Sequence, residues 1–105
     1  MVVLLESKTS CFMKRKKIVV LGSSNTDMIV EVPYLPAAGE SIIGVEFRTA
    51  AGGKGANQAV SAERAVGDVT LIACVGNDDF GDRALAAFAE DGIHTEFVIR
   101  DKFAP

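Results

Sequence analysis

The most informative stretch of this chain is Ala51-Gly52-Gly53-Lys54-Gly55-Ala56-Asn57-Gln58. Three glycines within four positions let the backbone adopt positive φ angles and bring its N–H groups close to a ligand. Residues 56–66 have the spacing of a helix, and a helix that begins in a glycine loop presents free N–H donors and the positive end of its dipole. Lys54 and Asn57 add a cation and an amide at the same point. The stretch therefore predicts a site for a polyhydroxylated or anionic small molecule.

Composition fits one modest globular domain, since the chain has 105 residues and 49% of them are hydrophobic. The net charge of −3 is divided unevenly: residues 1–17 carry +4 and the remaining 88 residues carry −7. An acidic body argues against nucleic acid as a partner, because binding to phosphate backbones depends on clustered Lys and Arg. Cys11 and Cys74 lie far apart without CxxC spacing, and no secretory signal is recognised, which favours a cytoplasmic location.

The N-terminal residues 1–16 are predicted to be a disordered extension that precedes a domain over residues 17–105. Met13 is followed by a basic run and then by a clear strand, which is typical of a natural start. The apolar run of residues 1–5 is too short for a signal peptide or a membrane span, so no membrane association is expected. The alternative is an N-terminal arm that docks on the domain.

Strands and helices alternate along the rest of the chain. Ile18–Leu21 is a continuous apolar run, typical of a strand that is buried on both faces. The further expected elements are strands at 28–32, 41–44 and 45–49, a helix over 55–66 with Gly67 as its C′ residue, a strand at 69–75, a helix over 79–91 that ends at Gly92, and a strand at 97–99. This order predicts an α/β fold with a parallel sheet covered by helices. The short strands before the first helix predict an insertion that stands off the sheet.

Polar residues 23–27 follow the first buried strand. Ligands of open α/β sheets bind beyond the carboxyl ends of the strands, so Asp27 is placed to accept hydrogen bonds from two vicinal hydroxyls. The alternative is that Asn25 or Asp27 only makes an Asx-turn. The glycine loop itself matches neither a P-loop nor a dinucleotide-binding fingerprint.

Five features in order carry a resemblance to a known family. After the buried strand come Asn25-Thr26-Asp27, Gly39-Glu40, Gly52-Gly53-Lys54-Gly55-Ala56-Asn57-Gln58 and Val75-Gly76-Asn77-Asp78-Asp79-Phe80-Gly81. This order resembles the ribokinase-like family of sugar kinases, also called the PfkB family, over almost all of residues 17–105. One departure is Ala38, where such sequences often have proline, and we expect it to affect turn stiffness only.

The resemblance implies the N-terminal part of a doubly wound, Rossmann-like ribokinase fold with a small β-sheet lid. It also implies that two segments bind a sugar, with Asp27 as the main contact. The implied substrate-binding residues are Asn25, Thr26, Asp27, Gly53, Lys54, Gly55, Ala56 and Asn57. Asp78 falls on the family's acidic position, where we expect it to cap the second helix. His94 is expected to be a surface or turn histidine, and no catalytic, cofactor-binding or metal-ligating residue is predicted in this chain.

The implied activity is transfer of the γ-phosphoryl group of ATP to a sugar hydroxyl, with ribose converted to ribose 5-phosphate and with Mg²⁺ and K⁺ present. The family's Gly-Ala-Gly-Asp motif, which carries the general base, does not occur in this sequence. Phosphoryl transfer depends on positioning and charge stabilisation around ATP and Mg²⁺, so we expect the chain alone to be inactive and to bind no cofactor.

The expected partners are a small sugar, either ribose or a related pentose or nucleoside, and further protein. Residues 97–105 are typical of the first arm and turn of a hairpin, so we expect a fragment that associates with a missing C-terminal half. A homodimer through the lid is the other association that the resemblance implies. Two alternative functions remain open, namely a non-catalytic module that binds a sugar or nucleoside, and an inactive structural remnant.

Overall fold

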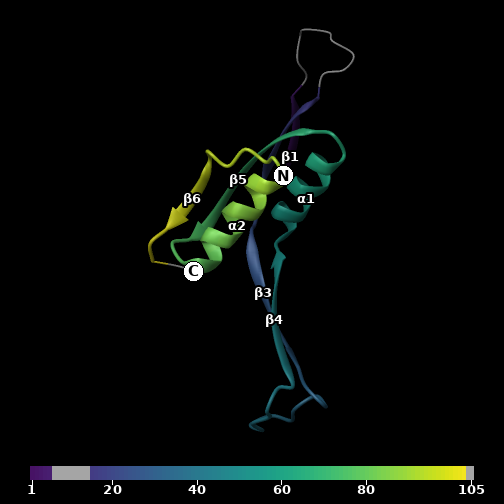
Figure 1. Ribbon diagram of the computed structural model, residues 1–105, viewed down its shortest axis with the longest axis vertical. Helices are drawn as coiled ribbons and strands as arrows, with labels where there is room; N and C mark the ends of the chain where they lie inside the picture. The colour runs from purple at the N-terminus through teal and green to yellow at the C-terminus, as the bar shows by residue number, and fades with distance from the viewer. Residues whose placement is uncertain (6–14, 104–105) are drawn as a thin grey trace.

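Two sheets of different size organise the chain, and the computed structural model describes residues 1–5 and 15–103 (Figure 1). The larger sheet has the strand order β1-β2-β5-β6. Its strands are β1 (Val2–Leu5), β2 (Lys17–Leu21), β5 (Asp68–Gly76) and β6 (Val98–Asp101). β2, β5 and β6 run parallel, whereas β1 pairs with β2 in the antiparallel direction. The parallel sheet that the apolar runs predict is therefore present.

Two helices make the crossovers between the parallel strands. The helix α1 (Lys54–Arg64) leads into β5, and α2 (Asp79–Glu90) connects β5 with β6. Crossovers of this kind are right-handed, and both proceed in the same direction across the sheet, so both helices lie on one face. A single core joins them to alternate residues of the strands: Val20, Ala56, Ala59, Val69, Leu71, Ala73, Phe88 and Ile93. This arrangement confirms the predicted α/β class.

The opposite face of the large sheet carries no described helix. Residues of β5 that point to this face, such as Ile72 and Cys74, are partly or fully exposed, while their neighbours in the strand are buried. Leu21 of β2 and Ile99 of β6 are exposed as well. Within residues 1–5 and 15–103 the sheet is therefore covered on one side only.

The insertion is a long hairpin that projects from the large sheet (Figure 1). It pairs β3 (Asn25–Glu31) with β4 (Glu46–Gly52) in the antiparallel direction over seven residue pairs. The strand predicted at 41–44 is wrong, and the strands predicted at 28–32 and 45–49 overlap these two longer strands. Residues 32–45 form the connection, with a turn at Gly39, whose φ is 77°. Strand length here follows cross-strand pairing, which no local pattern in either segment reveals.

The end of α1 differs from the expectation. The helix ends at Arg64, and the residue with a left-handed backbone is Val66, with φ of 61°, while Gly67 has no positive φ. The N–H groups of Val66 and Gly67 donate to Glu63 O and Ala62 O at 3.1 and 2.9 Å, which satisfies two carbonyls of the last turn. Gly67 is needed for another reason, because a Cβ there would lie 2.8 Å from Ala62 O.

The N-terminal residues also differ from the expectation for the part that the structure describes. We expected residues 1–16 to be a disordered extension, yet Val2–Leu5 forms β1 and pairs with β2. For these residues the alternative of a docked arm describes the structure. Residues 6–14 lie outside the described part of the chain.

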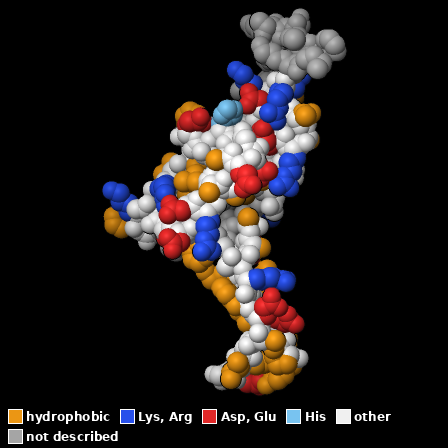
Figure 2. Space-filling model, viewed as in Figure 1, with side chains coloured by type: hydrophobic (Ala, Val, Ile, Leu, Met, Phe, Trp, Pro, Cys, Tyr) orange, Lys and Arg blue, Asp and Glu red, His pale blue; other side chains and the backbone are white. Residues whose placement is uncertain are grey.

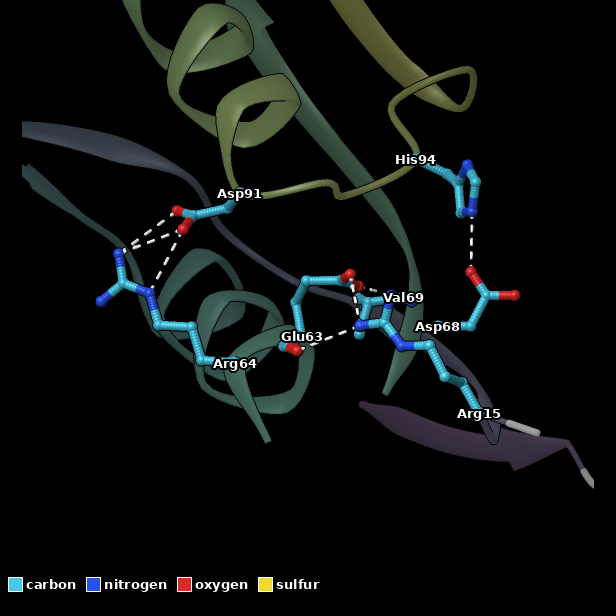
Figure 3. A network of polar contacts seen from close by, with 7 residues as sticks. All are labelled: Arg15, Glu63, Arg64, Asp68, Val69, Asp91 and His94. Carbon is cyan, nitrogen blue, oxygen red and sulfur yellow. Dashed lines mark hydrogen bonds and ion pairs between the residues drawn. The ribbon is translucent and has the colours of Figure 1, made fainter. Parts of the chain in front are cut away.

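Polar contacts hold the amino-terminal end of β5 against the helices (Figure 3). The buried carboxylate of Glu63 accepts a hydrogen bond from Arg15 at 2.6 Å and another from the Val69 N–H at 3.0 Å. Two further pairs lie at the surface nearby, namely Arg64–Asp91 at 3.2 Å and His94–Asp68 at 2.7 Å. His94 is therefore an exposed residue at the opposite end of β5 from the glycine loop.

Candidate functional site

Two short loops meet where β2 ends and α1 begins. The carbonyl of Ser23 accepts a hydrogen bond from the Ala56 N–H at 2.9 Å, and its hydroxyl accepts one from the Lys54 N–H at 3.2 Å. The backbones of Gly22 and Gly55 touch, since a Cβ on Gly55 would lie 2.5 Å from the Gly22 carbonyl carbon. The helix start is thereby fixed against the carboxyl end of β2. Ser23 was not among the predicted site residues, because nothing about a serine after a strand indicates which remote N–H it will accept.

Gly53 is the N-cap of α1 and has φ of 100°. Residues that carry a Cβ rarely adopt this backbone angle. A Cβ at this position would also lie 2.5 Å from Ser23 O. The second glycine of the loop is therefore required both for its backbone angle and for its closeness to β2. Here the sequence argument and the structure agree on the physical reason for the glycine.

Asp27 lies against the glycine loop. Its carboxylate is so near Gly52 that a Cβ on Gly52 would lie 2.7 Å from one carboxylate oxygen. Asn25 is opposite Gly52 in the hairpin register, and its amide donates to Asp27 Oδ1 at 3.0 Å. Asn25 and Asp27 are both exposed, so the carboxylate keeps a face toward solvent. The structure thus brings together Asn25, Asp27 and the glycines that begin α1.

Lys54 and Asn57 lie in the first turn of α1, and both are exposed. Among residues 1–5 and 15–103, neither the Lys54 ammonium nor the Asn57 amide has a hydrogen-bond or ion-pair partner. Both groups are therefore available to a ligand. Gly55 and Ala56 are buried, so their contribution to such a ligand is through the backbone.

Thr26 points to the other face of β3, where two cavities lie between the hairpin and α2. One has a volume of about 290 Å³ and the other about 220 Å³. Both are lined by Ser24, Asn25, Thr26, Phe80 and Ala84. Ligand sites usually begin near about 300 Å³, so each cavity has room for a small molecule only. Of the predicted residues, Asn25 and Thr26 line both cavities and Ala56 lines one, whereas Asp27, Lys54 and Asn57 line neither.

Asp78 begins α2, as the sequence predicts. Its side chain accepts a hydrogen bond from the Gly81 N–H at 2.9 Å, and its backbone is extended, as in a helix N-cap. Gly81 packs on the carbonyl of Gly76, which leaves no room for a Cβ. Arg100 fastens the same turn by an ion pair with Asp82 at 2.6 Å. The capping role of Asp78 is therefore confirmed.

Gly39-Glu40, the third of the five features, lies at the far end of the hairpin. The Glu40 N–H donates to Ala37 O at 3.1 Å and closes a turn around Gly39. A hydrogen bond with the Glu40 side chain raises the pKa of Tyr34 above its ordinary value. These residues shape the hairpin tip, at a distance along the chain from the glycine loop.

Neither a metal-binding cluster nor a membrane-spanning helix is found in the part of the chain that the structure describes. Within residues 1–5 and 15–103 there is no group of three or more His, Cys, Asp or Glu side chains that could hold a metal ion. None of the helices there is long and apolar enough to cross a membrane.

Comparison with known proteins identifies the family. The family model described as "pfkB family carbohydrate kinase" matches residues 15–105. The chain belongs to the pfkB family of carbohydrate kinases. This family member is 45% identical over 84 residues to the ribokinase of Haemophilus influenzae, and the match covers 80% of the chain and 28% of that enzyme. The predicted family is confirmed, and within the pfkB family the chain is of the ribokinase type.

Solved structures of ribokinases share the fold of this pfkB chain. The structure of Arabidopsis thaliana ribokinase complexed with ribose and ATP matches with a TM-score of 0.75 and 35% identity, over 83% of this chain and 28% of that one. Ribokinase from Cryptococcus neoformans in complex with ADP matches with a TM-score of 0.72 and 32% identity, over 86% of this chain and 28% of that one. The chain thus has the fold of the N-terminal part of a ribokinase and spans 28% of the length of each of these proteins.

Proposed function

We propose that this chain supplies the sugar-binding part of a ribokinase-type kinase that transfers the γ-phosphoryl group of ATP to ribose. One observation carries the proposal: the exposed carboxylate of Asp27 is held against Gly52, directly beside the start of α1. A carboxylate has two oxygens and several lone pairs, so it can accept hydrogen bonds from two vicinal hydroxyls. Such charge-assisted bonds are roughly twice as strong as neutral ones.

The other groups complete a surface suited to a polyhydroxylated ligand. The amide of Asn25 donates to Asp27 Oδ1, which orients the carboxylate before the sugar arrives. Lys54 adds a cation and Asn57 adds an amide that both donates and accepts, and neither is engaged by another described residue. The names of the matched ribokinases support ribose as the sugar in this surface.

ATP, Mg²⁺ and K⁺ are the cofactors that we propose for a complete enzyme of this type. The matched ribokinase structures with ATP and with ADP support the nucleotide. We propose that the nucleotide and metal contacts of such an enzyme lie outside this chain. Its own residues bind and orient the sugar. A cytoplasmic setting is proposed from the two cysteines without CxxC spacing.

A homodimer through the hairpin is also proposed. One face of the hairpin carries a row of exposed apolar side chains, among them Met28, Val30 and Phe47, and Val30 lies opposite Phe47 in the register. Figure 2 shows hydrophobic side chains along the hairpin and at its tip. Exposed apolar patches of this kind mark protein–protein contacts, and a second copy of the hairpin is the complementary partner that we propose.

The proposal is tested with a fusion enzyme, in which residues 1–105 are followed by the part of the Haemophilus influenzae ribokinase that lies beyond the matched region. We expect the fusion enzyme to release ADP in a ribose-dependent reaction, and the 105-residue chain to release none above background. Ribose, 2-deoxyribose and fructose are compared in the same coupled assay. A fusion enzyme that uses fructose but not ribose would contradict the assigned sugar. Turnover by the 105-residue chain would contradict the proposal that this chain supplies only the sugar-binding part of the enzyme.

A further inference from the structure

The strand β1 covers one edge of the parallel sheet, although it lies outside the family match, which begins at residue 15. Its register places Val3 opposite Val19 and Leu4 opposite Ile18. The backbones of Met1 and Leu21 exchange two hydrogen bonds of 2.6 and 2.7 Å. The whole edge of β2 is therefore occupied by a segment that the matched part of the family does not include.

The topology of the sheet shows what this edge is suited to. From β2 the chain proceeds through β5 to β6 in one direction, and both helices lie on one face. In doubly wound sheets the strand order reverses beside the first strand, so that the next strands add to its other edge. The other edge of β2 is the edge that β1 covers. The matched ribokinases are longer, since this chain spans 28% of each.

The strand β1 is a weak occupant of that position. It has four residues, and the side chains of Val2, Val3 and Leu4 are all exposed. An edge strand gains most of its stability from burial of its side chains, and short exposed strands open at low cost in free energy. A parallel strand in this position, with the helix that connects it, would bury apolar side chains of β2 such as Leu21, which stay exposed beside β1.

We propose that β1 is a replaceable cover for the β2 edge. It protects this edge in the 105-residue chain and is displaced by a parallel strand from the part of a pfkB-type domain that these residues do not include. An unpaired edge is a template for pairing with other chains, so β1 prevents such pairing at β2 until it is displaced. The inference depends on the family and the topology, and it does not depend on the sugar site.

Hydrogen exchange compares β1 in two proteins, the 105-residue chain and the fusion enzyme defined above. We expect the β1 amides to be protected at least about tenfold more in the 105-residue chain than in the fusion enzyme, because they open locally once displaced. The amides of β5 serve as the internal reference and should stay protected in both proteins. Equal protection of β1 in the two proteins would overturn the proposal, and so would a loss of protection at β5 in the fusion enzyme.

Two proline variants give an independent measurement. Opposed residues of an antiparallel pair alternate between hydrogen-bonded and non-hydrogen-bonded pairs. Because Met1 and Leu21 form a hydrogen-bonded pair, Val3 and Val19 form the next one, whereas the Leu4 N–H points away from β2. Val3→Pro should therefore lower the melting temperature of the 105-residue chain by several degrees, while Leu4→Pro should lower it by less than half as much. Neither variant should change the melting temperature of the fusion enzyme. An equal effect of Val3→Pro in both proteins would show that β1 stays on β2.

Discussion

At the scale of single residues, each glycine of the loop is required because another part of the chain lies too near to leave room for a Cβ. Gly52 faces the Asp27 carboxylate, Gly53 combines a positive φ with contact to Ser23, and Gly55 touches the backbone of Gly22. A Cβ on Gly53 or Gly55 would separate the loop from the residues that follow β2, and a Cβ on Gly52 would displace the Asp27 carboxylate. The sequence predicted that the loop needs glycines, since three of them precede a helix. It could not predict which atoms they meet, because these atoms lie about thirty residues away along the chain.

The cap of α2 gives the first prediction. Asp78→Ala removes the bond to the Gly81 N–H, which should cost about 1 kcal/mol and lower the melting temperature by roughly 4–8 °C in a domain of this size. Asp79→Ala is the matched control, since Asp79 lies in the first turn but is not the cap, and its effect should be smaller. Calorimetry measures both variants. An increase of tenfold or more in the sugar KM of the fusion enzyme, without a change in melting temperature, would mean that Asp78 acts on the ligand.

At the scale of elements, the helices and parallel strands were predictable, while the left-handed residue after α1 and the extent of the hairpin were not. The apolar run of β2 and the spacing of α1 and α2 are local signals, so these elements lie within two residues of their expected bounds. The left-handed position after α1 is held by a valine, a residue type that gives no such signal. The two hairpin strands are longer than expected because each is extended by pairing with the other.

Val66 gives the second prediction. A β-branched side chain with φ of 61° is strained, and Val66 is 74% exposed, so little packing is lost when it is replaced. Val66→Gly should stabilise the chain by about 1 kcal/mol, because glycine adopts this backbone without strain. Val66→Ala should gain less than half as much, since alanine retains Cβ. Both values come from urea unfolding, and a destabilised Val66→Gly variant would show that the valine is not strained.

At the scale of the whole molecule, the sequence predicted the fold class and the family but missed one contact. A parallel sheet with an inserted hairpin follows from the order of apolar runs and helices, and the family model confirms the resemblance. The pairing of β1 with β2 joins segments on opposite sides of residues 6–14, and a four-residue apolar run carries no signal of its partner. Thr26 and Asp27 point to opposite faces of the hairpin, because successive residues of a strand do so.

The exposed face of the hairpin gives the third prediction. Phe47→Asp places a charge on the proposed dimer contact and should raise the dimer dissociation constant of the fusion enzyme by about tenfold or more. Phe97→Asp is a matched control, because Phe97 lies outside the hairpin and is 62% exposed, against 60% for Phe47. Sedimentation equilibrium measures both. The same effect from the two variants, or none from either, would contradict dimerisation through the hairpin.

The most direct test of the sugar-binding role is the ribose KM of the fusion enzyme after Asp27→Ala. Loss of two charge-assisted hydrogen bonds, at roughly 1.5–3 kcal/mol each, should raise that KM by about two to four orders of magnitude. The ATP KM should change by less than about threefold, because the nucleotide contacts are not assigned to this chain. Glu31→Ala is the control, an exposed carboxylate on the same strand away from the glycine loop, and it should leave both constants unchanged. A ribose KM within about twofold of the parent after Asp27→Ala would contradict the assignment of the sugar site to these residues.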